Sequence, residues 1–130
     1  MSNIPKDLKY TRDHEWARVD GSTVTVGITD FAQGKLGDVV FVELPTVGST
    51  FDADESVGTV ESVKSVSELF TPVGGAVTAV NDALHDSPEN LNTDPYGDGW
   101  IFKINAANKT DITQLLSASQ YEAFLKDEDG

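Results

Sequence analysis

Short runs of β-branched and apolar residues recur along most of the chain, separated by Gly, Pro and Asp. Runs over residues 16–19 and 23–28 flank Asp20-Gly21, a residue pair that is typical of the turn of a β-hairpin. Further runs predict strands over residues 38–44, 56–63, 66–70, 76–80 and 100–104. This spacing predicts a mainly β fold, arranged as a flattened β-sandwich or a barrel-like structure.

The segments between these runs predict short helices. Thr29 can cap a helix over residues 30–36, and Gly37 can end it. The stretch 81–99 is rich in loop-forming residues, with a short helix start at Ser87-Pro88-Glu89.

The final quarter of the chain changes from strand-like to helical patterning. Asp111 can cap one helical turn, and Ser119 to Glu122 has the spacing of a capping box that would open a second helix. We therefore expect one domain over residues 1–130, with a core of about 16–104 and a helical extension of about 110–126.

Charge narrows the possible partners. Nine basic residues against 22 acidic ones give a net charge of −13, and such a surface repels phosphate backbones and anionic lipid. We expect no nucleic acid and no membrane among the partners, and a preference for proteins with basic docking faces. Solubility alone would explain the same acidity.

Cysteine content and the chain start bear on the cellular compartment. The chain has no cysteine, which excludes a disulfide framework and thiol chemistry of the polypeptide. Residues 1–7 carry neither a signal core nor a transit pattern. We expect a cytoplasmic protein, or a mitochondrial matrix protein if this is a mature eukaryotic form.

The sequence contains no recognisable catalytic apparatus. His14 and His85 are the only histidines, and neither lies in the ligand spacing of a structural zinc site. The glycines match neither GxGxxG nor a Walker A loop, and no serine lies in a nucleophile elbow. We expect no enzyme activity, no catalytic residues and no metal site.

Lys64 lies near a turn between two predicted strands, within Glu61-Ser62-Val63-Lys64-Ser65-Val66-Ser67-Glu68. A free lysine amine is a poor nucleophile near neutral pH, and the neighbouring carboxylates Glu61 and Glu68 favour its charged form. The turn instead leaves the amine accessible to a modifying enzyme. From the residues alone, an ordinary solvated lysine is the simpler interpretation.

Several blocks, in order along nearly the whole chain, resemble the H protein family of the glycine cleavage system. The segment Glu61-Ser62-Val63-Lys64 with Ser67-Glu68-Leu69 resembles its lipoylation site. The other matches are Tyr10 to Trp16, Gly27 to Gln33, Leu36 to Pro45, Pro72-Val73, Asn81, Leu84, Pro88, Asn90-Leu91-Asn92, Asp94 to Gly97 and Gly99-Trp100.

The resemblance implies a lipoyl-carrier fold and lipoate linked as an amide to Lys64. The turn residues Glu61, Ser62, Val63, Ser65, Val66 and Glu68 would support the attachment, with Val63 and Val66 anchoring the hairpin. The arm would reach about 12–14 Å from the backbone.

The same resemblance implies a non-catalytic, monomeric shuttle. A pyridoxal-phosphate glycine decarboxylase would load the aminomethyl group of glycine, and an aminomethyltransferase with tetrahydrofolate would remove it. Dihydrolipoamide dehydrogenase would then reoxidise the dithiol, and lipoate-attaching enzymes would first install the arm.

Two related functions fit the sequence as well. One is an H-like protein that relays lipoyl groups to the carrier domains of 2-oxoacid dehydrogenases. The other is a lipoyl or biotinyl domain of another complex, although these domains are usually shorter. Lys35 also departs from the family, because some members carry a histidine there, near the resting place of the loaded arm.

Overall fold

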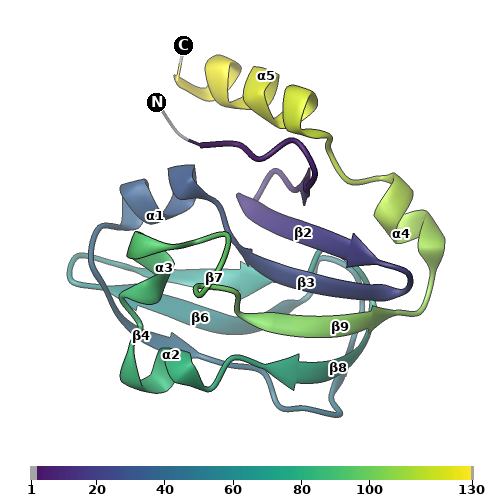
Figure 1. The fold of residues 1–130 in the computed structure, drawn as a ribbon, viewed down its shortest axis with the longest axis horizontal. Helices are drawn as coiled ribbons and strands as arrows, with labels where there is room; N and C mark the ends of the chain where they lie inside the picture. The colour runs from purple at the N-terminus through teal and green to yellow at the C-terminus, as the bar shows by residue number, and fades with distance from the viewer. Residues whose placement is uncertain (1–2, 130) are drawn as a thin grey trace.

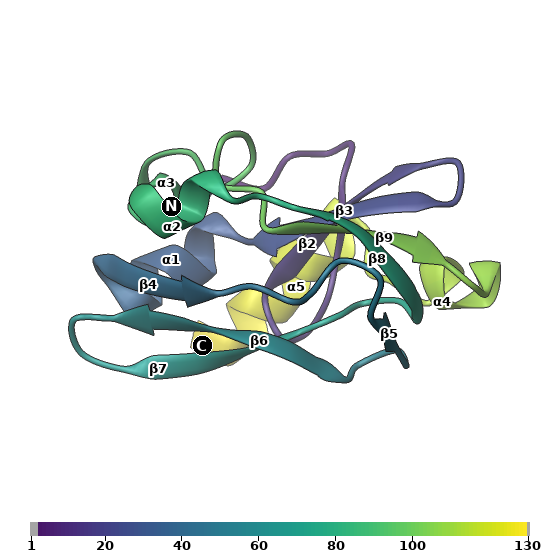
Figure 2. The ribbon, with the colours of Figure 1, turned by 90° about the horizontal axis from the view of Figure 1, so that it is seen from below.

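The computed structural model describes residues 3–129, with side chains to Asp127, as two open antiparallel sheets. Figure 2 shows them as two layers, with β6 and β7 below and β2, β3, β8 and β9 above. The larger sheet has the order β1-β2-β3-β9-β8-β5 and the smaller one β4-β6-β7. The strands are β1 (Lys9–Tyr10), β2 (Glu15–Asp20), β3 (Thr23–Ile28), β4 (Val39–Glu43), β5 (Thr50–Phe51), β6 (Ser56–Ser62), β7 (Val66–Phe70), β8 (Gly75–Val80) and β9 (Phe102–Ala106). The mainly β sandwich is confirmed.

The first hairpin forms as expected, but its turn lies one residue later. Asp20 pairs with Thr23, so the two-residue loop is Gly21-Ser22 and not the expected Asp20-Gly21. Gly21 has φ +64°, and a tight hairpin turn needs positive φ at its first loop residue. Glycine adopts that conformation without steric cost, which fixes the register.

The main hydrophobic core lies between the two sheets. Val42, Val60 and Leu69 come from the smaller sheet, and Val26 and Phe102 from the larger one, all essentially inaccessible to water. Burial of such side chains contributes roughly 1.5–3 kcal/mol each. The core therefore holds the two layers, and the hairpin of β6 and β7 extends from one of them.

Helix α1 (Asp30–Leu36) confirms the prediction from its caps. Thr29 Oγ1 accepts a hydrogen bond from Ala32 N at 3.2 Å, and Gly37 ends the helix with φ +79°. The loop-rich stretch contains α2 (Ala83–Asp86), which was not predicted, and α3 (Asn90–Thr93). Figure 1 shows α1, α3 and the tip of the β6–β7 hairpin at the same end of the molecule.

The two tail helices form, but with other caps than the sequence suggested. In α4 (Lys109–Thr113) the cap is Asn108, whose side chain accepts from Thr110 N, while Asp111 accepts from Gly74 N at 3.0 Å. In α5 (Ala118–Asp129) the capping box is Ser117 with Gln120. Ser117 Oγ accepts from Gln120 N at 3.2 Å, and Gln120 Oε1 accepts from Ser117 N at 2.8 Å. Ser119 therefore lies inside the helix.

A second, aromatic cluster joins α5 to the edge of the larger sheet. The rings of Tyr10 and Tyr121 stack with centroids 4.7 Å apart. Trp16 is fully buried and donates its indole N–H to Pro95 O at 2.8 Å. We call Leu8, Tyr10, Trp16, Tyr121 and Leu125 the aromatic cluster. None of the helices over residues 3–129 is long and apolar enough to cross a membrane.

Candidate functional site: the lysine turn and its cleft

Lys64 lies exposed at the tip of the hairpin formed by β6 and β7, as the sequence predicts. The strands pair from Ser56 with Phe70 to Glu61 with Val66, and Ser62 N donates to Ser65 O at 2.8 Å. Residues 62–65, called the lysine turn below, therefore close a regular hairpin.

The buried Ser62 side chain organises this turn. Its Oγ accepts hydrogen bonds from Ser65 N at 3.1 Å and Lys64 N at 3.3 Å, and it lies 3.2 Å from Ser65 O, to which it can donate. Val63 N donates to Asp38 O at 3.0 Å, which ties the turn to the loop before β4. These bonds satisfy the main chain where the ladder ends, so the lysine backbone is held in place.

The expected anchoring role of two valines is wrong. Val63 is 69% exposed and Val66 is 64% exposed, so neither packs into the core. The reason is strand alternation: Val60 and Ser62 point inward on β6, and Glu61 and the turn face outward. Polar contacts hold the turn, and apolar side chains surround Lys64 on the surface.

The stem of Lys64 lies against Gly37. A Cβ placed on Gly37 would lie 3.4 Å from Lys64 Cε and 3.9 Å from Nζ. Within residues 3–129 the Lys64 ammonium forms no ion pair. The amine is therefore available, and its stem leaves the turn toward the C-terminal end of α1.

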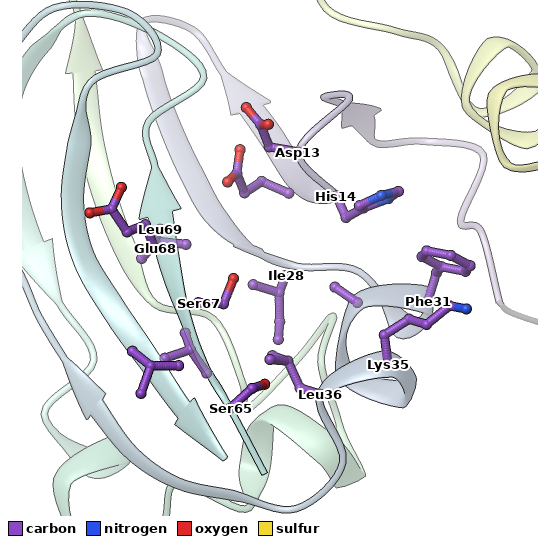
Figure 3. A pocket seen from close by; sticks show the side chains of 14 residues that line it. Asp13, His14, Ile28, Phe31, Lys35, Leu36, Ser65, Ser67, Glu68 and Leu69 are labelled. Atoms are coloured by element: carbon purple, nitrogen blue, oxygen red, sulfur yellow. The ribbon is translucent and has the colours of Figure 1, made fainter. Parts of the chain in front are cut away.

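A cleft of about 470 Å³ opens beside the lysine turn, between α1 and β7. Figure 3 shows Phe31, Lys35 and Leu36 of α1 on one side and Ser65, Ser67 and Glu68 on the other. Ile28 and Leu36 contribute apolar surface within it. A small group with both apolar and polar parts fits such a cleft.

Glu15 is a buried carboxyl group in the cleft, and its pKa is raised. Its side chain is 2% exposed, and burial raises its pKa to about 8, although hydrogen bonds from Thr11 and Phe70 favour the charged form. Thr11 Oγ1 donates to one carboxyl oxygen at 2.9 Å and Phe70 N to the other at 3.2 Å. Sequence reasoning missed this residue. Its only signal was a carboxylate at the inward-facing start of a strand next to Trp16.

Comparison with known proteins identifies the family. The profile of the family described as glycine cleavage H-protein matches residues 8–128. The chain belongs to this family. The glycine cleavage system H protein of Rubrobacter xylanophilus is 55% identical over 129 residues, covering 99% of this chain and all of that one. That of Cronobacter sakazakii is 54% identical, covering 98% of this chain and all of that one.

A solved structure supports the same assignment. The crystal structure of a glycine cleavage system H protein from Mycobacterium marinum superposes with a TM-score of 0.85 at 45% identity. The match covers 92% of this chain and 97% of the other. The sandwich described above is therefore the fold of the H-protein family.

Two cleft residues of this H-protein family member have other contacts. Lys35 Nζ lies 5.3 Å from the centroid of the Phe31 ring, and Figure 3 shows it directed away from Ser65 and Ser67. His14 Nδ1 lies 2.9 Å from Tyr121 OH, and its ring packs on Phe31 with centroids 4.7 Å apart. His14 therefore connects the cleft to α5.

Proposed function

We propose that this chain is a non-catalytic lipoyl carrier of the glycine cleavage system, with Lys64 as the attachment residue. The observation that carries the proposal is an exposed lysine, held on a hydrogen-bonded turn, directly beside a cleft of about 470 Å³ that is lined by both apolar and polar side chains. Membership of the H-protein family supports the same function.

The residues present fit a lipoyl group. An amide bond to Lys64 Nζ would create an arm of about 12–14 Å, and the lysine stem already lies along Gly37 at the α1 side of the cleft. Lys64 would hold the lipoyl group, which would supply a redox-active disulfide as acceptor for the aminomethyl group and for the two electrons released when glycine is oxidised.

The residues of the chain itself would position and protect the arm. Ser62 holds the main chain of Lys64, so the arm starts from a defined direction. Ile28, Phe31 and Leu36 would exclude water from a resting arm. Glu15, with its pKa of about 8, would hold a proton near neutral pH. After loss of this proton, its carboxylate could pair with a nearby ammonium group.

The partners follow from this function. We propose that the decarboxylase, the aminomethyltransferase and dihydrolipoamide dehydrogenase each receive the arm from Lys64. Glu61 and Glu68 are exposed on either side of the lysine turn, where a lipoate-attaching enzyme with a basic surface could contact them.

Intact-mass measurement after incubation with lipoate and a lipoate ligase tests the proposal. We expect one lipoyl group on the wild type and none on Lys64→Arg, which keeps the charge but cannot form the amide. No gain on the wild type would disprove the attachment. Reconstitution with the decarboxylase then distinguishes glycine cleavage from relay of lipoyl groups. A relay protein would not support exchange of the carboxyl carbon of glycine with CO2.

A further inference from the structure

One side chain of α3 holds the loop between α1 and β4. Asn92 Nδ2 donates to Gly37 O at 2.8 Å and to Gln33 Oε1 at 3.0 Å, and its Oδ1 accepts from Val39 N at 2.9 Å. The amide thus uses both of its N–H donors and its carbonyl oxygen on one segment more than 50 residues away.

The loop that Asn92 holds is the loop on which the lysine turn rests. Asp38 O, between the two backbone groups bound by Asn92, accepts the hydrogen bond from Val63 N. Gly37, whose carbonyl Asn92 binds, is also the residue against which the Lys64 stem lies. A continuous set of contacts therefore runs from Asn92 through residues 37–39 to the lysine turn.

We propose that Asn92 is a positioning residue for lipoyl attachment at Lys64. The inference rests on the proposed function, because it assumes that an enzyme must recognise this turn. A preformed turn is recognised with a smaller loss of conformational entropy than a mobile one. Asn92 acts on that turn although its own hydrogen bonds go to Gln33, Gly37 and Val39 and not to residues 62–65.

Asn81 provides a control for the loss of an asparagine side chain that bonds distant backbone groups, although it is more buried than the half-buried Asn92. It is 8% exposed, and its Nδ2 donates to Asp98 O at 2.8 Å and Trp100 O at 2.7 Å. It therefore also joins distant backbone carbonyls, but it makes no hydrogen bond to residues 37–39. Asn81→Ala removes comparable bonds and leaves the lysine turn in place.

The first readout needs no lipoate. In unmodified protein, we expect hydrogen exchange at the Val63 amide to be about tenfold faster in Asn92→Ala than in the wild type, because that amide is protected only while the loop stays in place. In Asn81→Ala the Val63 amide should exchange at the wild-type rate. Equal exchange at Val63 in the wild type and Asn92→Ala would overturn the proposal.

The second readout is the steady-state rate of lipoyl attachment, measured below the melting temperature of each variant. We expect kcat/KM for Asn92→Ala as acceptor to fall about tenfold, since a misplaced acceptor loses reactive alignment. Asn81→Ala should match the wild type. An equal loss of kcat/KM in both variants would mean that Asn92 contributes only to overall stability, and it would overturn the proposal.

Asn92→Asp is a second variant that tests the proposal if Asn92→Ala folds poorly. The aspartate retains an oxygen for Val39 N but loses both donations and places a carboxylate opposite Gly37 O. We expect the same faster exchange at Val63, and wild-type exchange would count against the proposal. If the wild type gains no lipoyl group at all, the proposed function fails, and hydrogen exchange still decides whether Asn92 positions the turn.

Discussion

The lysine turn and the aromatic cluster are built in opposite ways. In the lysine turn, Ser62 Oγ and Asp38 O accept the backbone hydrogen bonds that hold the chain, and Val63 in the turn and Val66 next to it are exposed. In the aromatic cluster, the side chains are buried and the rings of Tyr10 and Tyr121 stack. One region presents a side chain to solvent, whereas the other removes side chains from it.

The difference indicates a separation of tasks. Burial of apolar surface provides most of the folding free energy, so the aromatic cluster should control stability. Polar contacts of a turn add little net stability but restrict its conformations. Substitutions in the cluster should therefore change unfolding, and substitutions in the turn should change recognition of Lys64.

Tyr121→Ala should have the largest effect on stability. It removes a fully buried ring stacked on Tyr10, together with a hydroxyl 2.8 Å from Thr29 Oγ1 and 2.9 Å from His14 Nδ1. We expect a loss of about 3–5 kcal/mol in the free energy of unfolding, as for other large buried side chains. Urea denaturation measures it.

The same variant tests whether stability and recognition of Lys64 are controlled by different regions. At a temperature where Tyr121→Ala remains folded, lipoyl attachment at Lys64 should proceed at the wild-type rate. A slowed attachment in the folded variant would mean that the cluster also shapes the turn.

Glu15→Gln should change how stability depends on pH. The folded-state pKa of Glu15 is about 8, above the ordinary carboxyl value of about 4.5, so the folded protein binds this proton more tightly than the unfolded chain. Stability therefore falls as pH rises from about 4.5 to about 8, by about 4 kcal/mol. Glutamine carries no charge and should remove this decline.

Unfolding of Glu15→Gln and wild type at pH 5, 6.5 and 8 checks the prediction. Glu43→Gln, at an exposed carboxylate of β4, is the control and should keep the wild-type slope. Identical slopes for Glu15→Gln and wild type would show that Glu15 is ionised in the folded protein at little cost.

The longer strands and α1 were predictable because their signals are local, whereas the two-residue strands β1 and β5 were not predicted. Alternating apolar residues marked β2, β3 and β6, and Thr29 with Gly37 marked both ends of α1. The turn register shifted by one residue because Gly21, and not Asp20, occupies the position that needs positive φ. The tail caps were misplaced because Asn108 and Ser117 compete with equally suitable neighbours, Asp111 and Ser119.

The site was predictable only in part. The position of Lys64 on a turn follows from local pattern, and the sequence resemblance pointed to its modification. The cleft, the buried Glu15 and the contacts of Asn92 depend on residues far apart in sequence that tertiary packing brings together. The prediction that Val63 and Val66 anchor the hairpin was wrong because the sequence of two short strands does not show which side chains near the turn face the core.

Gly37→Ala should affect both stability and presentation, because Gly37 ends α1 and touches the Lys64 stem. Its φ of +79° with ψ of −157° is strained for alanine, and we expect a loss of about 1–3 kcal/mol in stability. The added methyl group itself would make ordinary contact with Lys64 Cε at 3.4 Å. Thermal unfolding measures the strain, and Gly34→Ala is the control because α1 has open space there.

Ser62→Ala should have the smallest effect on stability and a clear effect on the turn. The substitution leaves Lys64 N and Ser65 N without their acceptor, although both residues are exposed. We expect a loss of about 1 kcal/mol in the free energy of unfolding and about tenfold slower lipoyl attachment, since the turn would sample other conformations.

Ser56→Ala, at the opposite end of β6, controls for the loss of a serine hydroxyl from the same strand and should attach lipoate at the wild-type rate. If Ser62→Ala also attaches lipoate at that rate, the enzyme can shape the turn as it binds, and hydrogen bonding within the free turn is not what guides recognition. A slowed Ser62→Ala with near-normal stability would instead place the role of this serine in presentation, because a defect that came from unfolding would scale with the lost stability.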